Sequence, residues 1–527
     1  MSVQVALSYG LPSGVEWGSQ AARVRLAGAK ERPRLSYRGA VKDPLVLREL
    51  MGALYDVVIA DFRFRPSAQR EQFQRWLVAK LDREAAAERA RIEAERRRYL
   101  QWLWEQERAA WLILDPVCSV HPDQLFFEAF SRDGSAYARV GVDRGAMEES
   151  GEVVCGTTNV DFSAGLYEAI RRLRSIWRTE LALGDAAAGE AKLEVATEGA
   201  VRHTEKKVEV PEGWLRGFVQ IGAAFLLPTL QVELDPIHVQ ELCRVLHHRR
   251  AKVSPRALRW ELRPGQPASV VFEPWEHRLT FHGSRHGATE ERIVRIWGRR
   301  RLCLIERVIP VAERFTFHLL GRGLPYFVTA RAGALDFTLG LSGWTKTDWT
   351  STARFDALIA RRGGGAQPSP KPLAWLQQHH RGAPAEIAAA LGLSAAEVHA
   401  SLAEAAGQGL VIYDLLHQVY RHRPLLATPL PAEATLGADP QARDARALLA
   451  RKAAAITGVR GVPAGRNLRG RVSEDPTHVY EPEVVLDDQG RVVEGACGCW
   501  FAKQHGLKQG LCAHQHALLL LDDALAQ

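Results

Sequence analysis

The chain has 527 residues, and 69 Lys and Arg against 61 Asp and Glu give it a formal net charge of +8. This length exceeds what one hydrophobic core serves, so we expect an α+β multidomain protein, and the mild positive excess permits an acidic partner such as nucleic acid without requiring one. The absence of an eighteen-residue apolar run excludes a membrane-spanning helix, and the lack of a signal-peptide pattern together with four isolated cysteines predicts a cytoplasmic protein without a disulfide framework.

The first segment, residues 1–66, is predicted to be an α/β unit. A helical pattern of leucines from Leu45 to Leu54 is followed by the apolar, β-branched run Val57–Phe62, which is typical of a buried strand. A long charged helix is then predicted over residues 67–113. Its Arg96–Arg98 run indicates a solvated face paired with nearby Glu, with a helix that tracks nucleic acid as the alternative.

Residues 114–361 are predicted to form a mixed α+β domain of unknown function. Helical patterns cover Gly165–Arg178 and Pro236–His248, and strand-rich blocks cover Ser269–Phe281 and Ile293–Leu341. Tryptophan is frequent in this part of the chain. We expect these tryptophans to pack in the core, because scattered tryptophans on strands do so more often than they form a base-stacking platform.

No catalytic signature stands out in residues 1–361. The sequence contains no phosphate-binding loop, no nucleophile elbow, no HExxH pair and no deaminase motif. A nuclease- or transposase-like site would need carboxylates such as Asp56, Asp61, Asp115 or Asp123, but no spacing distinguishes them from turn and cap residues. We therefore assign no catalytic or cofactor-binding residue and expect a non-enzymatic protein, with a nucleic-acid-processing enzyme as the alternative.

Residues 371–425 follow a Gly- and Pro-rich linker, and their pattern resembles a winged helix-turn-helix. Three short helices are predicted, the second starting at Pro384 and the third capped by Ser394, followed by a hairpin. The third helix carries Glu397 and Glu404 and no Lys or Arg, although a DNA reader presents cations or amides there. We therefore favour a structural or protein-binding role over major-groove reading. The basic residues of this unit lie in the wing: His417, Arg421, His422 and Arg423.

The stretch from Arg443 to Arg471 is the densest positive segment, with eight Lys and Arg against Asp444 alone. A helix over 442–456 followed by a Gly- and Arg-containing loop would offer a surface for the phosphates of DNA or RNA. A solvated connecting helix is the equal alternative. The candidate phosphate contacts are Arg460, Arg466, Arg469 and Arg471.

Three of the seven cysteines gather near the C-terminus, after two predicted strands joined by a hairpin turn. Cys497 and Cys499 are two residues apart in an extended segment and so point the same way. Cys512 and His514 repeat that spacing at the start of an apolar helix. Three sulfurs and one imidazole form a closed tetrahedral set that is typical of structural zinc, and we expect one Zn²⁺ per chain. His516 is predicted to point away along the helix.

This pattern, CxC, twelve residues and CxH between a hairpin and a helix, resembles the SWIM zinc finger over residues 475–527. The resemblance implies a zinc-stabilised module that binds DNA or proteins, with Cys497, Cys499, Cys512 and His514 as ligands. Such fingers occur beside Swi/Snf-type helicases, in Mutator-type transposases and in a plant kinase family. The sequence as a whole predicts a zinc-binding adaptor that docks nucleic acid through residues 440–527, or a protein through the finger or winged helix.

Overall fold

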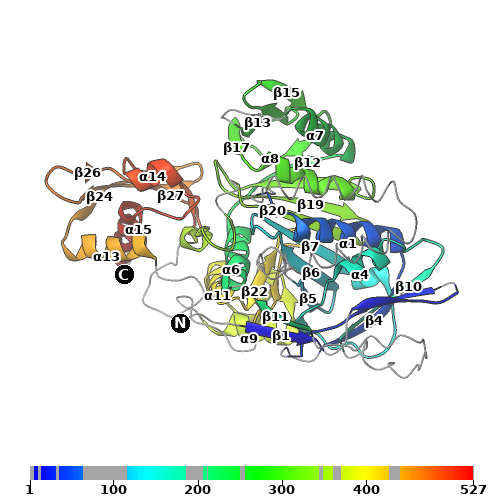
Figure 1. The fold of residues 1–527 in the computed structure, drawn as a ribbon. Coiled ribbons are helices and arrows are strands. Elements are labelled where there is room, and N and C mark those ends of the chain that lie inside the picture. The colour runs from blue at the N-terminus through cyan, green and yellow to red at the C-terminus, as the bar shows by residue number, and fades with distance from the viewer. Residues whose placement is uncertain are drawn as a thin grey trace, which may run out of the picture.

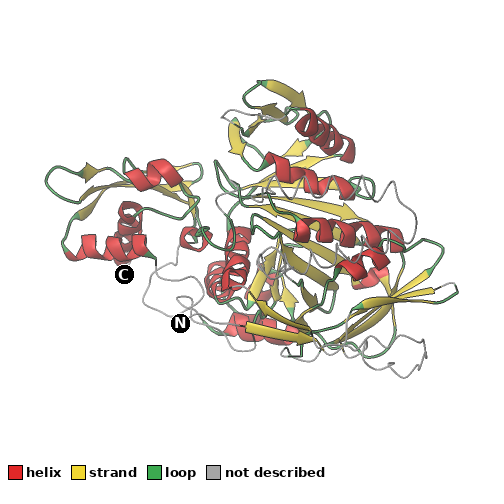
Figure 2. Ribbon diagram, viewed as in Figure 1, coloured by secondary structure: helices red, strands yellow, loops and turns green. Residues whose placement is uncertain are grey.

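The computed structural model describes residues 5–9, 13–19, 21–30, 32, 35–62, 115–184, 206–210, 212–249, 256–343, 348–359, 369–426 and 439–525. Within them the chain is a multidomain α+β protein with six sheets (Figures 1 and 2). The long helix predicted over 67–113 lies outside the described residues, as does most of both linkers. Among the described residues, no helix combines the length and apolarity that a bilayer crossing requires.

A nine-stranded antiparallel sheet forms the centre of the molecule. Its middle strands are buried along almost their whole length, as expected for strands covered on both faces. Helix α1 (Pro44–Ile59) packs on one face, and α6 (Glu212–Leu226) contributes aromatic side chains to the core on the other. In spatial order the strands are β16 (Arg285–His286), β12 (Leu230–Leu234), β18 (Arg314–Leu319), β19 (Tyr326–Ala332), β20 (Leu335–Leu341), β7 (Ala136–Asp143), β6 (Gln124–Phe130), β5 (Val117–Val120) and β9 (Gly156–Asn159).

The prediction of a strand over Val57–Phe62 is wrong, because α1 continues to Ile59. The apolar residues from Leu47 to Val58 keep a helical spacing, and they bury one face of α1 against the central sheet. This packing outweighs the strand preference of the β-branched residues near its end. The helix begins at Asp43, whose carboxylate accepts a hydrogen bond from the backbone N–H of Val46.

A second, five-stranded sheet joins two predicted segments, 1–66 and 114–361. In spatial order it contains β2 (Gly14–Trp17), β3 (Ala21–Leu26), β10 (Arg178–Gly184), β4 (Ser36–Val41) and β8 (Met147–Glu149). The helix predicted over Gly165–Arg178 is shorter than expected: α4 covers Ala164–Ile170, and Arg178 already belongs to β10. A separate two-stranded sheet pairs β1 (Val5–Tyr9) with β11 (Lys206–Val210).

A smaller sheet lies at the top of the view in Figure 1, beside α7 (Pro236–His248), which has the predicted bounds. Its strands are β15 (His277–Thr280), β14 (Ser269–Phe272), β13 (Leu258–Leu262) and β17 (Arg292–Ile296). The block predicted as strands over 293–341 also contains the short helices α8 (Arg299–Leu302) and η3 (Cys303–Val308). Trp260 and Trp349 are fully buried, as core packing requires.

Three helices and a hairpin follow at the positions predicted within 371–425. They are α9 (Lys371–His379), α10 (Pro384–Leu391), α11 (Ala395–Gly407), β22 (Val411–Asp414) and β23 (Val419–His422), with β21 (Arg381–Gly382) paired to β23. Ser394 caps α11 by accepting a hydrogen bond from the N–H of Glu397. Helix α6 packs against both α11 and β22, so this unit is attached to the central part of the molecule.

The C-terminal module, residues 439–525, lies to one side of the central sheet (Figure 1). The prediction of a helix to 456 and then a loop is wrong, because α13 ends at Ala450 and two long strands follow. Alternating exposed and buried residues on β25 allow one strand face to pack on α15. The elements are α13 (Pro440–Ala450), β24 (Ala454–Val462), β25 (Gly465–Ser473), β26 (Val479–Tyr480), β27 (Glu483–Leu486), β28 (Val492–Ala496), α14 (Trp500–His505) and α15 (Ala513–Leu525).

Candidate metal centre

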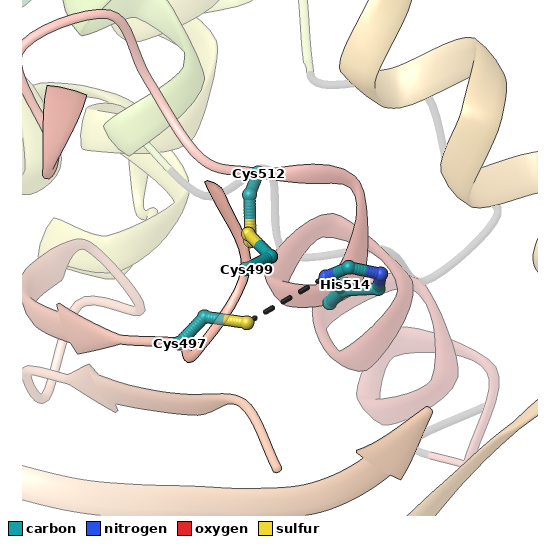
Figure 3. Close-up of side chains that lie close together, drawn as sticks. All are labelled: Cys497, Cys499, Cys512 and His514. Carbon is teal, nitrogen blue, oxygen red and sulfur yellow. Dashed lines mark hydrogen bonds between the residues drawn. The ribbon is translucent and has the colours of Figure 1, made fainter. Parts of the chain in front are cut away.

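Four predicted ligands converge in the C-terminal module (Figure 3). Cys497 directly follows β28, and Cys499 is the N-cap of α14, where its Sγ accepts a hydrogen bond from the N–H of Ala502 at 3.4 Å. Cys512 precedes α15, and His514 lies in the first turn of that helix. One ligand atom from each of the four lies within 4.8 Å of all the others.

The separation of Cys497 and His514 fits a shared ion. Cys497 Sγ lies 3.6 Å from His514 Nδ1. An ion bound tetrahedrally at about 2.3 Å from sulfur and about 2.0 Å from nitrogen would hold these atoms about 3.5 Å apart. Cys499, Cys512 and His514 are also buried. The group can therefore hold a metal ion, and the chain supplies all four ligands.

Two residues that the sequence analysis did not identify fix the orientation of the imidazole. His514 Nε2 lies 2.9 Å from Glu474 Oε1, so the Nε2–H donates to the carboxylate and Nδ1 is left to face the sulfurs. The ring of Tyr480 stacks on the imidazole with centroids 4.4 Å apart. Such outer partners set the tautomer and basicity of a ligating histidine. His516, as predicted, points elsewhere, with Nε2 3.6 Å from Asp439.

The thiols share protons unequally. A hydrogen bond from Cys512, helped by His514 and opposed by burial, lowers the pKa of Cys497 to about 4. The same hydrogen bond with Cys497, together with burial, raises the pKa of Cys512. Burial also raises the pKa of Cys499. One sulfur is thus a thiolate without any ion, and a bound cation would favour deprotonation of the other two.

The four arginines predicted to contact phosphate do not share one surface. Because side chains alternate along a strand, Arg469 and Arg471 lie on the outer face of β25, where Arg460 joins them opposite Asn467. Arg466 lies on the inner face, and its Nη1 is 2.8 Å from Asp522 Oδ1 of α15. Arg469 Nε also pairs with Glu483, at 3.2 Å.

The basic wing faces the protein interior. The side chains of Arg421 and Arg423 are 0% and 1% exposed. Arg421 Nε lies 2.8 Å from Asp414 Oδ2, and Arg423 Nε lies 3.4 Å from Glu128 Oε2. His417 Nδ1 lies 3.1 Å from Asp414. These cations are therefore used to attach the hairpin to the central sheet.

The carboxylates considered for a nuclease-like site have separate structural partners. Asp56 pairs with Arg307 at 2.8 Å, and Asp115 accepts a hydrogen bond from the N–H of Phe162. Asp123 pairs with Arg421. A different group, Asp143, Asp336 and His417, lies together beneath the wing, where Asp336 also pairs with the buried Arg139.

No protein-family model matches this chain, and no curated protein matches its sequence. Among solved structures, the proliferating cellular nuclear antigen of Entamoeba histolytica is similar over 58% of this chain and 97% of its own, with 7% sequence identity and a TM-score of 0.32. A likeness at this level is too weak to assign a fold or a function.

Proposed function

We propose that this protein is a non-enzymatic zinc-binding adaptor whose C-terminal module is a SWIM-type finger that docks nucleic acid. The observation that carries the proposal is the closed ligand group of Cys497, Cys499, Cys512 and His514. Zinc with three thiolates and one imidazole has no coordination position left for a substrate, which is typical of structural sites. The ion would hold β28, α14 and the start of α15 together.

The hairpin of β24 and β25 supports a docking role. Arg460, Arg469 and Arg471 are exposed on its outer face, and cations in such an array neutralise backbone phosphates without reading sequence. The side chain of Trp500, on α14, is 70% exposed and offers an apolar contact next to the ligand group. A protein partner is the second candidate, because Glu483 and Glu494 give the same sheet face mixed charge.

The winged-helix-like unit supports an architectural role over direct DNA reading. Its wing arginines are buried against the central sheet. The outward side of α11 presents Glu397 and Glu404, which would repel phosphates. The alternative of an enzyme with its active site in residues 1–361 has less support, because Asp56, Asp115 and Asp123 are engaged in separate contacts.

Titration of labelled duplex DNA with the full-length protein at several salt concentrations tests the proposal. The variant R460E/R469E/R471E should bind unrelated duplexes equally weakly. Neutralising three phosphate contacts fewer should reduce the slope of log affinity against log salt by about 0.9 per contact. The matched control is R443E/R446E/R451E, which makes the same charge change on α13 and its C-cap. Equal loss in both variants would contradict the assigned surface, and no binding by the wild type would favour the protein partner.

A further inference from the structure

Two cysteines that are isolated in the sequence lie side by side in the fold. Cys243 is on α7, and Cys303 begins η3, sixty positions later. Their Sγ atoms and a carboxylate oxygen of Glu306 all lie within 4.8 Å of one another. Cys243 is only 2% exposed, and Cys303 is half-buried. The described residues thus contain a second cluster of metal-ligand side chains, far from the finger in sequence.

The periodicity of two short elements brings the side chains together. Cys243 and His247 are four residues apart on α7 and so share one helix face. Cys303 and Glu306 are three residues apart on a 3-10 helix, where such positions eclipse. The two faces meet: His247 Nε2 lies 2.6 Å from Glu306 Oε1. Four side chains with metal-binding chemistry therefore meet at one contact.

The cluster lies in the wall of a cavity of about 720 Å³ that is open to solvent. Cys243, His247 and Glu306 line it together with Arg244, and Ile237 and Ile309 provide apolar parts of the wall. A metal ion could enter by this route, and a small molecule could reach it there. The finger differs, because its four ligands close around the ion.

We propose that Cys243, Cys303 and Glu306 bind a second divalent metal ion of the zinc class. His247 holds the Glu306 carboxylate in position, as outer partners of metal ligands do. Two thiolates and a carboxylate suit borderline-soft ions such as Zn²⁺, and three protein ligands leave a fourth position for water or a small ligand from the cavity. This site is independent of the proposed docking function, since it uses neither the finger nor its arginines.

Metal analysis of the purified full-length protein tests the site. Wild type should contain two equivalents of zinc, and C303S should contain one. C512S should also retain one equivalent, because it removes the finger metal only. The matched control is C155S, which alters another half-buried cysteine outside the cluster and should retain two equivalents.

Cobalt gives an independent readout. In the C512S background, Co²⁺ should produce thiolate-to-cobalt absorption, and added imidazole should alter its visible bands through the open position. H247A should weaken Co²⁺ binding about 10–100-fold without abolishing it. E306Q, at an accessible position, serves if a cysteine variant fails to fold, and should also weaken binding. One equivalent of zinc in wild type, unchanged zinc in C303S, or a Cys243–Cys303 disulfide in the purified protein would each overturn the proposal.

Discussion

Arg421 of the wing hairpin forms a two-pronged ion pair with Asp123, which lies 298 residues earlier in the chain. Nη1 lies 2.8 Å from Oδ1 and Nη2 lies 3.0 Å from Oδ2. Its Nε also contacts Asp414 of the same hairpin. Buried charges are tolerated when they are paired and hydrogen-bonded in this way. The pair therefore ties residues 411–422 to the edge of β6.

Breaking this pair should be costly. R421A should lower the free energy of unfolding by about 3–5 kcal/mol, because Asp123 and the buried Asp414 lose their common partner. Urea unfolding of wild type and variant measures the loss. R381A is the control: Arg381 also pairs with Asp123, at 3.6 Å, but its side chain is 40% exposed and should contribute about 1 kcal/mol or less. Similar losses in the two variants would contradict the assigned role.

Removing the finger metal should release only the C-terminal module. We expect a chelator, or C512S, to make residues 439–525 sensitive to limited proteolysis while the central sheet stays protected, because the ion replaces a larger core there. E474Q should reduce zinc affinity about 10–100-fold through His514. E481Q changes an exposed glutamate nearby and should have no effect. Full protease resistance of the metal-free protein would refute this prediction.

Close packing of α15 on β25 should make Gly470 hard to replace. A Cβ there would lie 2.1 Å from Leu518 Cδ2 and 2.8 Å from the Ala455 carbonyl oxygen. G470A should therefore destabilise the module by about 1–3 kcal/mol through overpacking. Thermal unfolding of the zinc-loaded protein is the measurement. G458A, on the partner strand, places its Cβ in open space and should leave the melting curve unchanged.

Buried His318 should make stability depend on pH. Burial lowers the pKa of His318 from 6.5 to about 4. As pH falls below 6.5, the unfolded chain binds a proton that the native ring refuses, so stability is lost down to pH about 4. The loss attributable to this ring is about 3 kcal/mol.

The variant H318Q should keep a hydrogen bond to Thr329 Oγ1 and lack this loss. Urea midpoints measured between pH 7 and pH 4 decide the matter. H282Q removes an exposed histidine and should leave the pH profile as in wild type. Parallel profiles for wild type and H318Q would show that the buried ring does not titrate in the native state.

Local signals predicted the elements that depend on local chemistry. Pro384 and Ser394 begin two helices as expected, because caps act within one turn. The ligand group Cys497 to His514 was also recognisable, because all four residues lie within eighteen positions. The identity of the ion and the role of the module stay predictions.

Contacts between distant parts of the chain could not be predicted from one sequence. The meeting of Cys243 with Cys303 depends on how α7 packs against η3. Arg421 was expected to be part of an exposed basic wing, but Asp123 and Asp414 bury it. Arg466 was grouped with three other arginines, although strand alternation places it against Asp522. In each case the deciding partner lies far away in sequence.

The strand order of the five-stranded sheet sets the sequence of events during synthesis. Strand β10 lies between β3 and β4, and its Arg178 is paired with Ala21, 157 positions earlier. At about 5–20 residues per second, the ribosome needs roughly 8–30 s to make the intervening chain. Until then the two facing strand edges of β3 and β4 are unpaired, and such edges are templates for aggregation. The nascent N-terminal segment should therefore be the stage of biogenesis that most needs a chaperone.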